Sequence, residues 1–232
     1  MRLREAETIR TSIPHDRAPQ KVQRTWLFDL DNTLHNASTH IFPQINRSMM
    51  AYICHHLNVD EAEATRLRQH YWQRYGATLR GLMRHHDTDP GHFLHHTHQI
   101  PNLKDILIIE RGLKAMLQRL PGQKIIFSNA PLNYTESVLA IARIRRCFDV
   151  VYTVERLRFQ PKPDIAGFLH LLKTESLNPR SCIMVEDTLP NLITAKRLGM
   201  KTVWVSTCTR HSPYVDVKVT SVLELPKRLG RL

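Results

Sequence analysis

The segment WLFDLDNTLHN, residues 26–36, decides the fold of this chain. Its apolar run, residues 26–28, predicts a buried strand, and Asn32-Thr33 predicts the turn that follows. Asp29 and Asp31 therefore stand at the carboxyl end of a strand, where side chains of an open α/β sheet face a ligand crevice. Two carboxylates this close repel each other unless a cation such as Mg²⁺ neutralises them. One is then suited to attack phosphorus and the other to pass a proton to the leaving oxygen.

Further polar groups follow other apolar runs. Residues 124–127 predict a second strand, which ends in Ser128 and Asn129, a hydroxyl and an amide able to donate to a phosphate oxygen. Lys162 lies between two prolines, each of which restricts the backbone, so it is suited to act as a fixed positive charge for phosphate and for the nucleophile.

A third apolar run, residues 182–185, ends in Glu186 and Asp187, with Asn191 further on. This second acidic pair is suited to completing a metal site. Each segment also has a plain structural explanation: Ser-Asn is a common turn, a lysine between prolines is usually solvated, and acidic residues favour helix N-termini. Their joint occurrence after strand-like runs, separated by helix-length segments, favours the catalytic interpretation.

With these segments in place, the sequence resembles the haloacid dehalogenase-like hydrolases. The four motifs of that family match DLDNT at 29–33, SNA at 128–130, KP at 162–163 and ED…N at 186–191, and the resemblance covers roughly residues 24–208. It implies an α/β fold with a Rossmann-like parallel sheet core and an inserted α-helical cap domain. It also implies magnesium-dependent hydrolysis of a phosphomonoester through an aspartyl-phosphate.

The resemblance assigns roles to five residues of the crevice. Asp29 is the nucleophile and Asp31 the general acid and base. Ser128 and Asn129 bind the transferring phosphoryl group, and Lys162 steadies Asp29 and the phosphate charge.

The same resemblance assigns the metal shell. Asp187 ligates Mg²⁺ together with Asp29 and the main-chain carbonyl of Asp31, and Glu186 holds a metal-bound water. This chain departs from the family in two places: Ser128 replaces the usual threonine but keeps the hydroxyl, and Glu186-Asp187 replaces the common Gly-Asp.

The order of segments predicts three parts. Residues 1–22 are polar and charged, without the apolar stretch of a signal peptide, and we expect a flexible arm. Residues 23–36 and 105–232 form the core, and residues 37–104 the helical cap. Within the cap, Asp60 and Gly76 mark the two ends of one helix, and Asp89-Pro90 begins another.

Residues 71–101 resemble the cap of the pyrimidine 5′-nucleotidase branch of the family, which implies UMP or CMP as the substrate. We expect Tyr75 and Arg80 to contact the substrate through stacking and hydrogen bonds. The alternative is that Tyr75 belongs to the cap core and Arg80 is solvated. The resemblance rests on Tyr75, Gly76, Leu79, Gly81, Leu82, His86, Asp89, Pro90 and His98.

Composition sets further bounds. The chain has 232 residues, a formal net charge of +12 and no apolar run long enough to cross a membrane. The basic residues are dispersed, so we expect no specific nucleic-acid partner. Four cysteines lack metal-site spacing, which suggests free thiols and a cytoplasmic location. We expect a monomer or small homo-oligomer.

Eleven of the fourteen histidines lie between residues 35 and 98, and all of these but His35 fall in the predicted cap. His92 and His96 are four residues apart, on one helix face. No acidic or cysteine partner accompanies them at a zinc-like spacing, so solvated or capping roles are the simpler interpretation.

Two alternative functions stay open. The first is a phosphatase of the same superfamily that acts on a sugar phosphate or phosphoglycolate. The second is a catalytically idle protein that binds nucleotide or nucleic acid. The intact acidic pairs and Lys162 argue against the idle protein.

Overall fold

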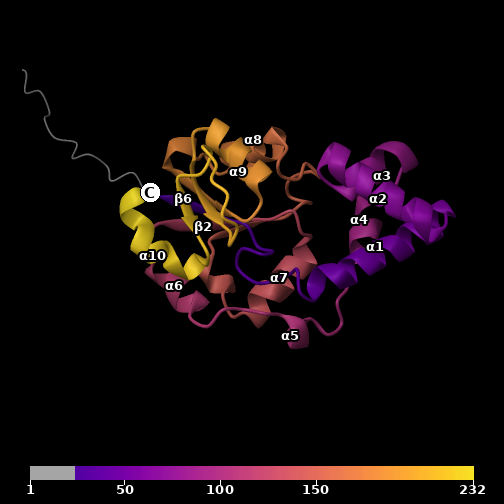
Figure 1. Ribbon diagram of the computed structural model, residues 1–232, viewed down its shortest axis with the longest axis horizontal. Coiled ribbons are helices and arrows are strands. Elements are labelled where there is room, and N and C mark those ends of the chain that lie inside the picture. The colour runs from indigo at the N-terminus through magenta and orange to yellow at the C-terminus, as the bar shows by residue number, and fades with distance from the viewer. Residues whose placement is uncertain (1–23) are drawn as a thin grey trace, which may run out of the picture.

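The computed structural model describes residues 24–232, so the arm predicted for residues 1–22 lies outside the described part of the chain. Its centre is a six-stranded, fully parallel sheet in the order β3-β2-β1-β4-β5-β6. The strands are β1 (Thr25–Phe28), β2 (Gln123–Phe127), β3 (Val150–Tyr152), β4 (Cys182–Glu186), β5 (Lys201–Val205) and β6 (Val217–Val219). The predicted α/β fold is confirmed (Figure 1).

Helices cover both faces of the sheet because alternate strand residues point in opposite directions. Trp26 and Phe28 pack in a buried cluster with side chains of α6, α7 and α10. Leu27, between them in sequence, packs on the other face with side chains of α8 and α9. The bounds are α6 (Leu113–Arg119), α7 (Leu132–Ile141), α8 (Ile165–Thr174), α9 (Leu189–Arg197) and α10 (Leu225–Arg228).

A separate group of helices forms the cap between β1 and β2 (Figure 1). These are α1 (Ile41–Leu57), α2 (Glu61–Tyr75), α3 (Thr78–His86) and α4 (Pro90–Thr97), and the short α5 (Leu103–Ile106) leads back to the core. The cap has its own buried cluster, built from Tyr52, Ile53, Ala64, Leu67, Tyr71, Leu79, Leu82, Phe93 and Leu94.

Local sequence explains where the cap helices begin and end. The Asp60 side chain accepts a hydrogen bond from the Glu63 main chain at the start of α2, and Gly76 ends that helix in a left-handed conformation. Asp89 caps α4 in the same way, with Pro90 at the first helical position. These expected ends are confirmed.

Apolar side chains of the cap and the core pack against each other at the start of α1 and after β3. Ile41 and Ile45, in the first turns of α1, belong to the core cluster that includes Trp26. Val154 and Phe159, from the loop after β3, pack in the cap cluster. No described helix is both long and apolar enough to cross a membrane.

Candidate active site

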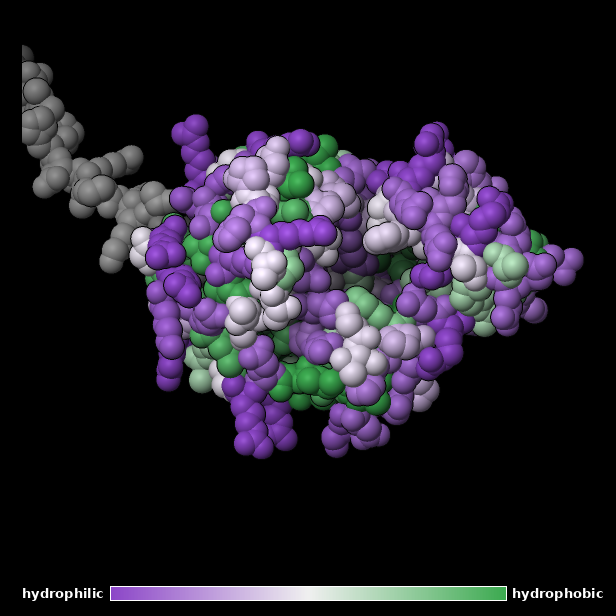
Figure 2. Space-filling view, in the orientation of Figure 1, coloured by the Kyte–Doolittle hydropathy of each residue, from purple (hydrophilic) through white to green (hydrophobic). Residues whose placement is uncertain are grey.

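The predicted catalytic residues meet at one edge of the sheet. Asp29 directly follows β1, Ser128 directly follows β2, and Glu186 is the last residue of β4. The strand order reverses direction between β1 and β4, which is where open α/β sheets bind ligands. The molecular surface is hollowed between the core and the cap (Figure 2).

Lys162 is the centre of the charge network, although it lies far from Asp29 in sequence. Its Nζ donates to Asp29 Oδ1 at 2.8 Å and to Glu186 Oε2 at 2.7 Å, and its side chain is 1% exposed. Burial alone would lower the pKa of this ammonium, but Asp29 and Glu186 outweigh burial and raise that pKa. Lys162 is therefore a permanent buried cation.

Two features hold the loop that carries Lys162. The Asn129 side chain accepts from the Lys162 main-chain N–H at 2.8 Å and donates to its carbonyl at 2.9 Å. Gly167 in α8 lies so close to the loop that a Cβ there would come within 2.4 Å of the Gln160 carbonyl oxygen. The Asn129 amide thus holds the lysine loop in place, a role beyond the predicted phosphate contact.

Asp29, Glu186 and Asp187 form an acidic cluster whose carboxylate oxygens lie within 4.8 Å of one another. Burial and the neighbouring Glu186 raise the pKa of Asp29 to about 7, although Lys162 opposes this. Burial also raises the pKa of Glu186 and, together with Asp29, that of Asp187. A single lysine therefore cannot compensate the repulsion among the three carboxylates.

That uncompensated charge fits a divalent cation. Hard carboxylate oxygens grouped at this spacing are the donors that Mg²⁺ takes, and a bound cation would favour the ionised form of all three acids. Asn191, which the sequence placed near this site, lies buried in α9, and its Oδ1 has no hydrogen-bond partner among the described residues.

Asp31 has different surroundings from Asp29. Tyr134 Oη, from the first turn of α7, donates to Asp31 Oδ1 at 2.6 Å, and His35 Nε2 lies 2.9 Å from the same oxygen. Burial and Asp31 raise the pKa of the Tyr134 hydroxyl, which therefore stays protonated. Sequence reasoning missed both partners. His35 could have been found, because it follows Asp31 by four residues in the same motif.

Ser128 is buried after β2, and its Oγ accepts a hydrogen bond from the Ala130 main chain at 3.0 Å. The hydroxyl proton makes no hydrogen bond to the described residues. It is free to serve the phosphate contact predicted for this residue.

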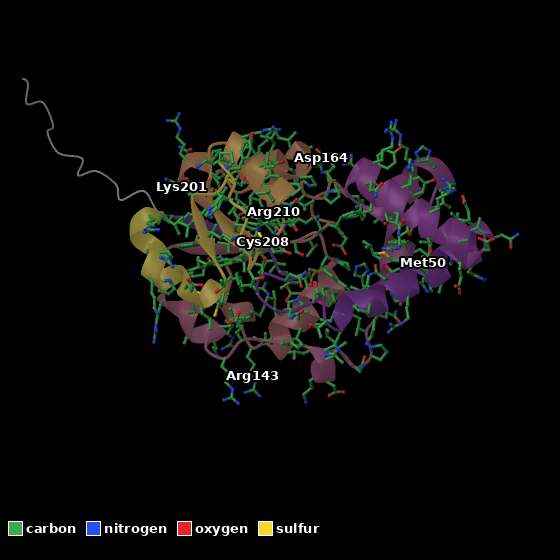
Figure 3. All side chains as sticks on the ribbon, in the orientation of Figure 1. Met50, Arg143, Asp164, Lys201, Cys208 and Arg210 are labelled. Carbon is green, nitrogen blue, oxygen red and sulfur yellow. The ribbon has the colours of Figure 1, made fainter. Side chains whose placement is uncertain are left out.

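The two cap candidates are engaged with protein groups. Tyr75 Oη lies 2.7 Å from His85 Nε2. Arg80 Nη1 donates to Asp164 Oδ2 at 2.7 Å, which joins α3 to the residue that caps α8. Asp164 lies on the side of the core that faces the cap (Figure 3). The substrate contacts expected of Tyr75 and Arg80 remain predictions.

The cap histidines gather from two helices. His56 of α1 lies beside His92 and His96 of α4, with ring centroids 4.3–6.4 Å apart. Within residues 24–232, however, the acidic cluster around Asp29 is the only group of three or more metal-binding side chains whose ligand atoms converge.

A cavity of about 380 Å³ lies between α4 of the cap and the start of α7. Tyr134 is on its wall, so the cavity adjoins the group that holds Asp31. His98, on the cap side, packs near the Tyr134 ring, and burial lowers its pKa to about 4. The remaining lining residues are Gly91, Leu94, His95, Gln99, Pro131, Asn133 and Glu155.

Known proteins resemble this chain in both sequence and fold. Phosphate metabolism protein 8 of Saccharomyces cerevisiae is 28% identical over 199 residues, which cover 78% of this chain and 61% of that protein. Hexitol phosphatase B of Escherichia coli is 28% identical over 102 residues, which cover 42% of this chain and 46% of that protein. The matched regions thus span about three fifths and less than half of these two relatives.

Among solved structures, an HAD phosphatase from Thermococcus onnurineus has a TM-score of 0.64 at 21% identity, covering 89% of this chain and 98% of that one. This likeness shows a shared fold. The model of a family described as "haloacid dehalogenase-like hydrolase" matches residues 26–205, more than half of the chain. With the four motifs gathered at one sheet edge, this match shows that the chain belongs to the haloacid dehalogenase-like hydrolase family.

Proposed function

We propose that this protein is a magnesium-dependent phosphomonoester hydrolase that works through an aspartyl-phosphate. The observation that carries the proposal is the buried network of Lys162 with Asp29 and Glu186, completed by Asp187. It joins a carboxylate nucleophile, a fixed cation and a divalent-metal site in a few ångströms. Phosphoryl transfer depends mainly on such positioning and charge neutralisation.

The reaction has two steps. Asp29 attacks phosphorus while the bond to the leaving oxygen breaks, and Asp31 gives that oxygen its proton. Asp31 then takes a proton from water, the water oxygen attacks phosphorus, and the bond to Asp29 breaks to release inorganic phosphate. Lys162 holds Asp29 and balances phosphate charge, and the Ser128 hydroxyl donates to a phosphate oxygen.

Magnesium, held by Asp29, Asp187 and the Asp31 carbonyl, with Glu186 behind a metal-bound water, would neutralise charge on the phosphate. The other groups act from positions that the structure already fixes.

For the substrate, we propose pyrimidine nucleoside 5′-monophosphates, UMP and CMP. The cavity beside Tyr134 supports this, since a leaving group protonated by Asp31 would lie next to that residue. Its volume of about 380 Å³ is at the small end of ligand pockets. Gln99 and Asn133 on its wall carry amides able to hydrogen-bond a pyrimidine edge. The cap resemblance to pyrimidine nucleotidases points the same way.

A second candidate is a sugar phosphate, favoured by the similarity to hexitol phosphatase B. Phosphate release with Mg²⁺ should therefore be measured on UMP, CMP, AMP, GMP, sugar phosphates and phosphoglycolate. We expect UMP and CMP to have the highest kcat/KM, because the cap resembles that of pyrimidine nucleotidases and a closed cap can reject the larger fused ring of a purine by steric clash. If a sugar phosphate has the highest kcat/KM, it replaces the nucleotide as the proposed substrate. If no compound of the panel releases phosphate, the proposed phosphatase activity is refuted.

A further inference from the structure

Two side chains hold one oxygen of Asp31. Tyr134 Oη donates to Asp31 Oδ1 at 2.6 Å, and His35 Nε2 approaches the same atom at 2.9 Å. The two donors are 3.5 Å from each other, so the three groups form a closed triangle. Tyr134 and His35 are both buried.

The other oxygen of Asp31 is left open. Oδ2 receives no hydrogen bond from residues 24–232, and the side chain is 17% exposed. A carboxylate rotates readily about its terminal torsion. Two donors on Oδ1 restrict that rotation and leave Oδ2 without a hydrogen-bond partner among residues 24–232.

The contacts of His35 leave Nε2 as its link to Asp31. Nδ1 is buried and has no hydrogen-bond partner in the described part of the chain, whereas Nε2 lies 2.9 Å from Asp31 Oδ1. His35 can therefore donate a proton to Asp31 only through Nε2.

We infer that Tyr134 and His35 are positioning residues for Asp31: by fixing Oδ1 they present Oδ2 to the leaving oxygen and then to the attacking water. This inference rests on the proposed function, in which Asp31 is the acid and base. The uncharged Tyr134 hydroxyl suits that role, because a fixed cation in its place would hold the carboxylate in its ionised form.

If Tyr134 positions Asp31, the loss in kcat/KM caused by Tyr134→Phe depends on the basicity of the leaving group. Phenolate is a strong base and needs its proton as the bond to phosphorus breaks. The p-nitrophenolate ion is a much weaker base and leaves without one. Phenyl phosphate and p-nitrophenyl phosphate fill nearly the same space, so a lost packing contact would affect both alike.

The main test compares kcat/KM of these two esters in Tyr134→Phe. We expect a fall of about 10- to 100-fold for phenyl phosphate, from the loss of a hydrogen bond to a charged group, and less than about threefold for p-nitrophenyl phosphate. Tyr152→Phe is the matched control, because that hydroxyl donates to Glu175 Oε1 at 2.7 Å, away from Asp31. It should change neither value by more than about twofold.

His35 is tested by a pair of variants. His35→Gln keeps an N–H donor near the Nε2 position, whereas His35→Leu fills the space without one. We expect His35→Gln to retain at least about threefold more kcat/KM on phenyl phosphate than His35→Leu, with little difference on p-nitrophenyl phosphate. Thermal unfolding of each variant checks that the fold is intact.

Different results would refute the proposed function and the inference about Tyr134 and His35. A wild type that releases phosphate from no nucleotide, sugar phosphate, phosphoglycolate or aryl ester refutes the function and the inference together. A working wild type in which Tyr134→Phe slows both aryl esters equally, or neither, refutes only the inference. If either His35 variant fails to fold, the Tyr134 comparison decides alone.

Discussion

The core and the cap line the same crevice with different kinds of side chain. The core contributes buried charges in fixed positions, with Lys162 between Asp29 and Glu186. The cap contributes His95, His98 and Gln99 to the cavity, and among residues 24–232 its ion pair to the core, between Arg80 and Asp164, is about one third exposed. This difference is consistent with the proposal that the core performs the phosphoryl chemistry and the cap selects what carries the phosphate. Substitutions in the two regions should therefore have effects of different size and kind.

The largest effect is expected at the nucleophile. Asp29→Asn keeps the side-chain shape but removes the oxygen that attacks phosphorus, so kcat should fall by more than about a hundredfold on every ester. The variant should still fold, because it relieves repulsion with Glu186. Steady-state kinetics on UMP and p-nitrophenyl phosphate check this. Retention of more than about a hundredth of the wild-type kcat would contradict the covalent mechanism.

The second effect concerns metal and pH. Chelation should stop activity and Mg²⁺ restore it, with Ca²⁺ inhibitory because it prefers looser coordination. Below the Asp29 pKa of about 7, Mg²⁺ must displace a proton. The half-saturating Mg²⁺ concentration should therefore rise as pH falls from 8 to 6, approaching about tenfold per unit.

A control for this pH effect uses metal-free protein. The pKa of Asp29 is raised on folding, so its contribution to stability is lost as pH rises through about 7. The Tm of the wild type should fall between pH 6 and 8 relative to that of Asp29→Asn, and Mg²⁺ should reverse the fall. Parallel Tm curves for the two proteins would contradict the raised pKa.

The third effect belongs to the cap. Burial lowers the pKa of His98 to about 4, below the roughly 6.5 of an unfolded histidine. The unfolded chain alone takes up this proton between those values, so stability present above pH ~6.5 is lost as pH falls towards 4. Thermal unfolding of His98→Gln should show a weaker loss over this range. Exposed His40→Gln should follow the wild type, and identical slopes for all three proteins would refute the prediction.

The smallest effect is expected where the cap touches the core. Arg80→Ala breaks a partly exposed ion pair, which is worth about 0.2–1 kcal/mol, so kcat/KM should fall by less than about fivefold. Asp164→Asn breaks the same pair but keeps an oxygen to cap α8. If the pair alone matters, the double variant should be no worse than either single one. A much larger loss in Arg80→Ala on UMP than on p-nitrophenyl phosphate would instead indicate the predicted substrate contact.

The sequence alone was enough for the fold class and for the local ends of the cap helices. Continuous apolar runs such as residues 26–28 mark buried strands, and caps such as Asp60 act over three residues. The motifs by themselves also predicted Asp29, Lys162, Glu186 and Asp187 as site residues. Their meeting could be expected because parallel strands end at one edge of a sheet.

Only the tertiary structure decided which partners these groups have. Tyr134 reaches Asp31 across 103 positions, and Asp164 reaches Arg80 across 84. Neither pairing leaves a trace in spacing or composition, because each depends on how helices from distant segments pack. The sequence by itself determined, through local patterns, which groups are proposed to carry the chemistry. The packing of cap against core decided how Asp31 is held and which cap side chains line the cavity, because only packing brings those segments within contact distance.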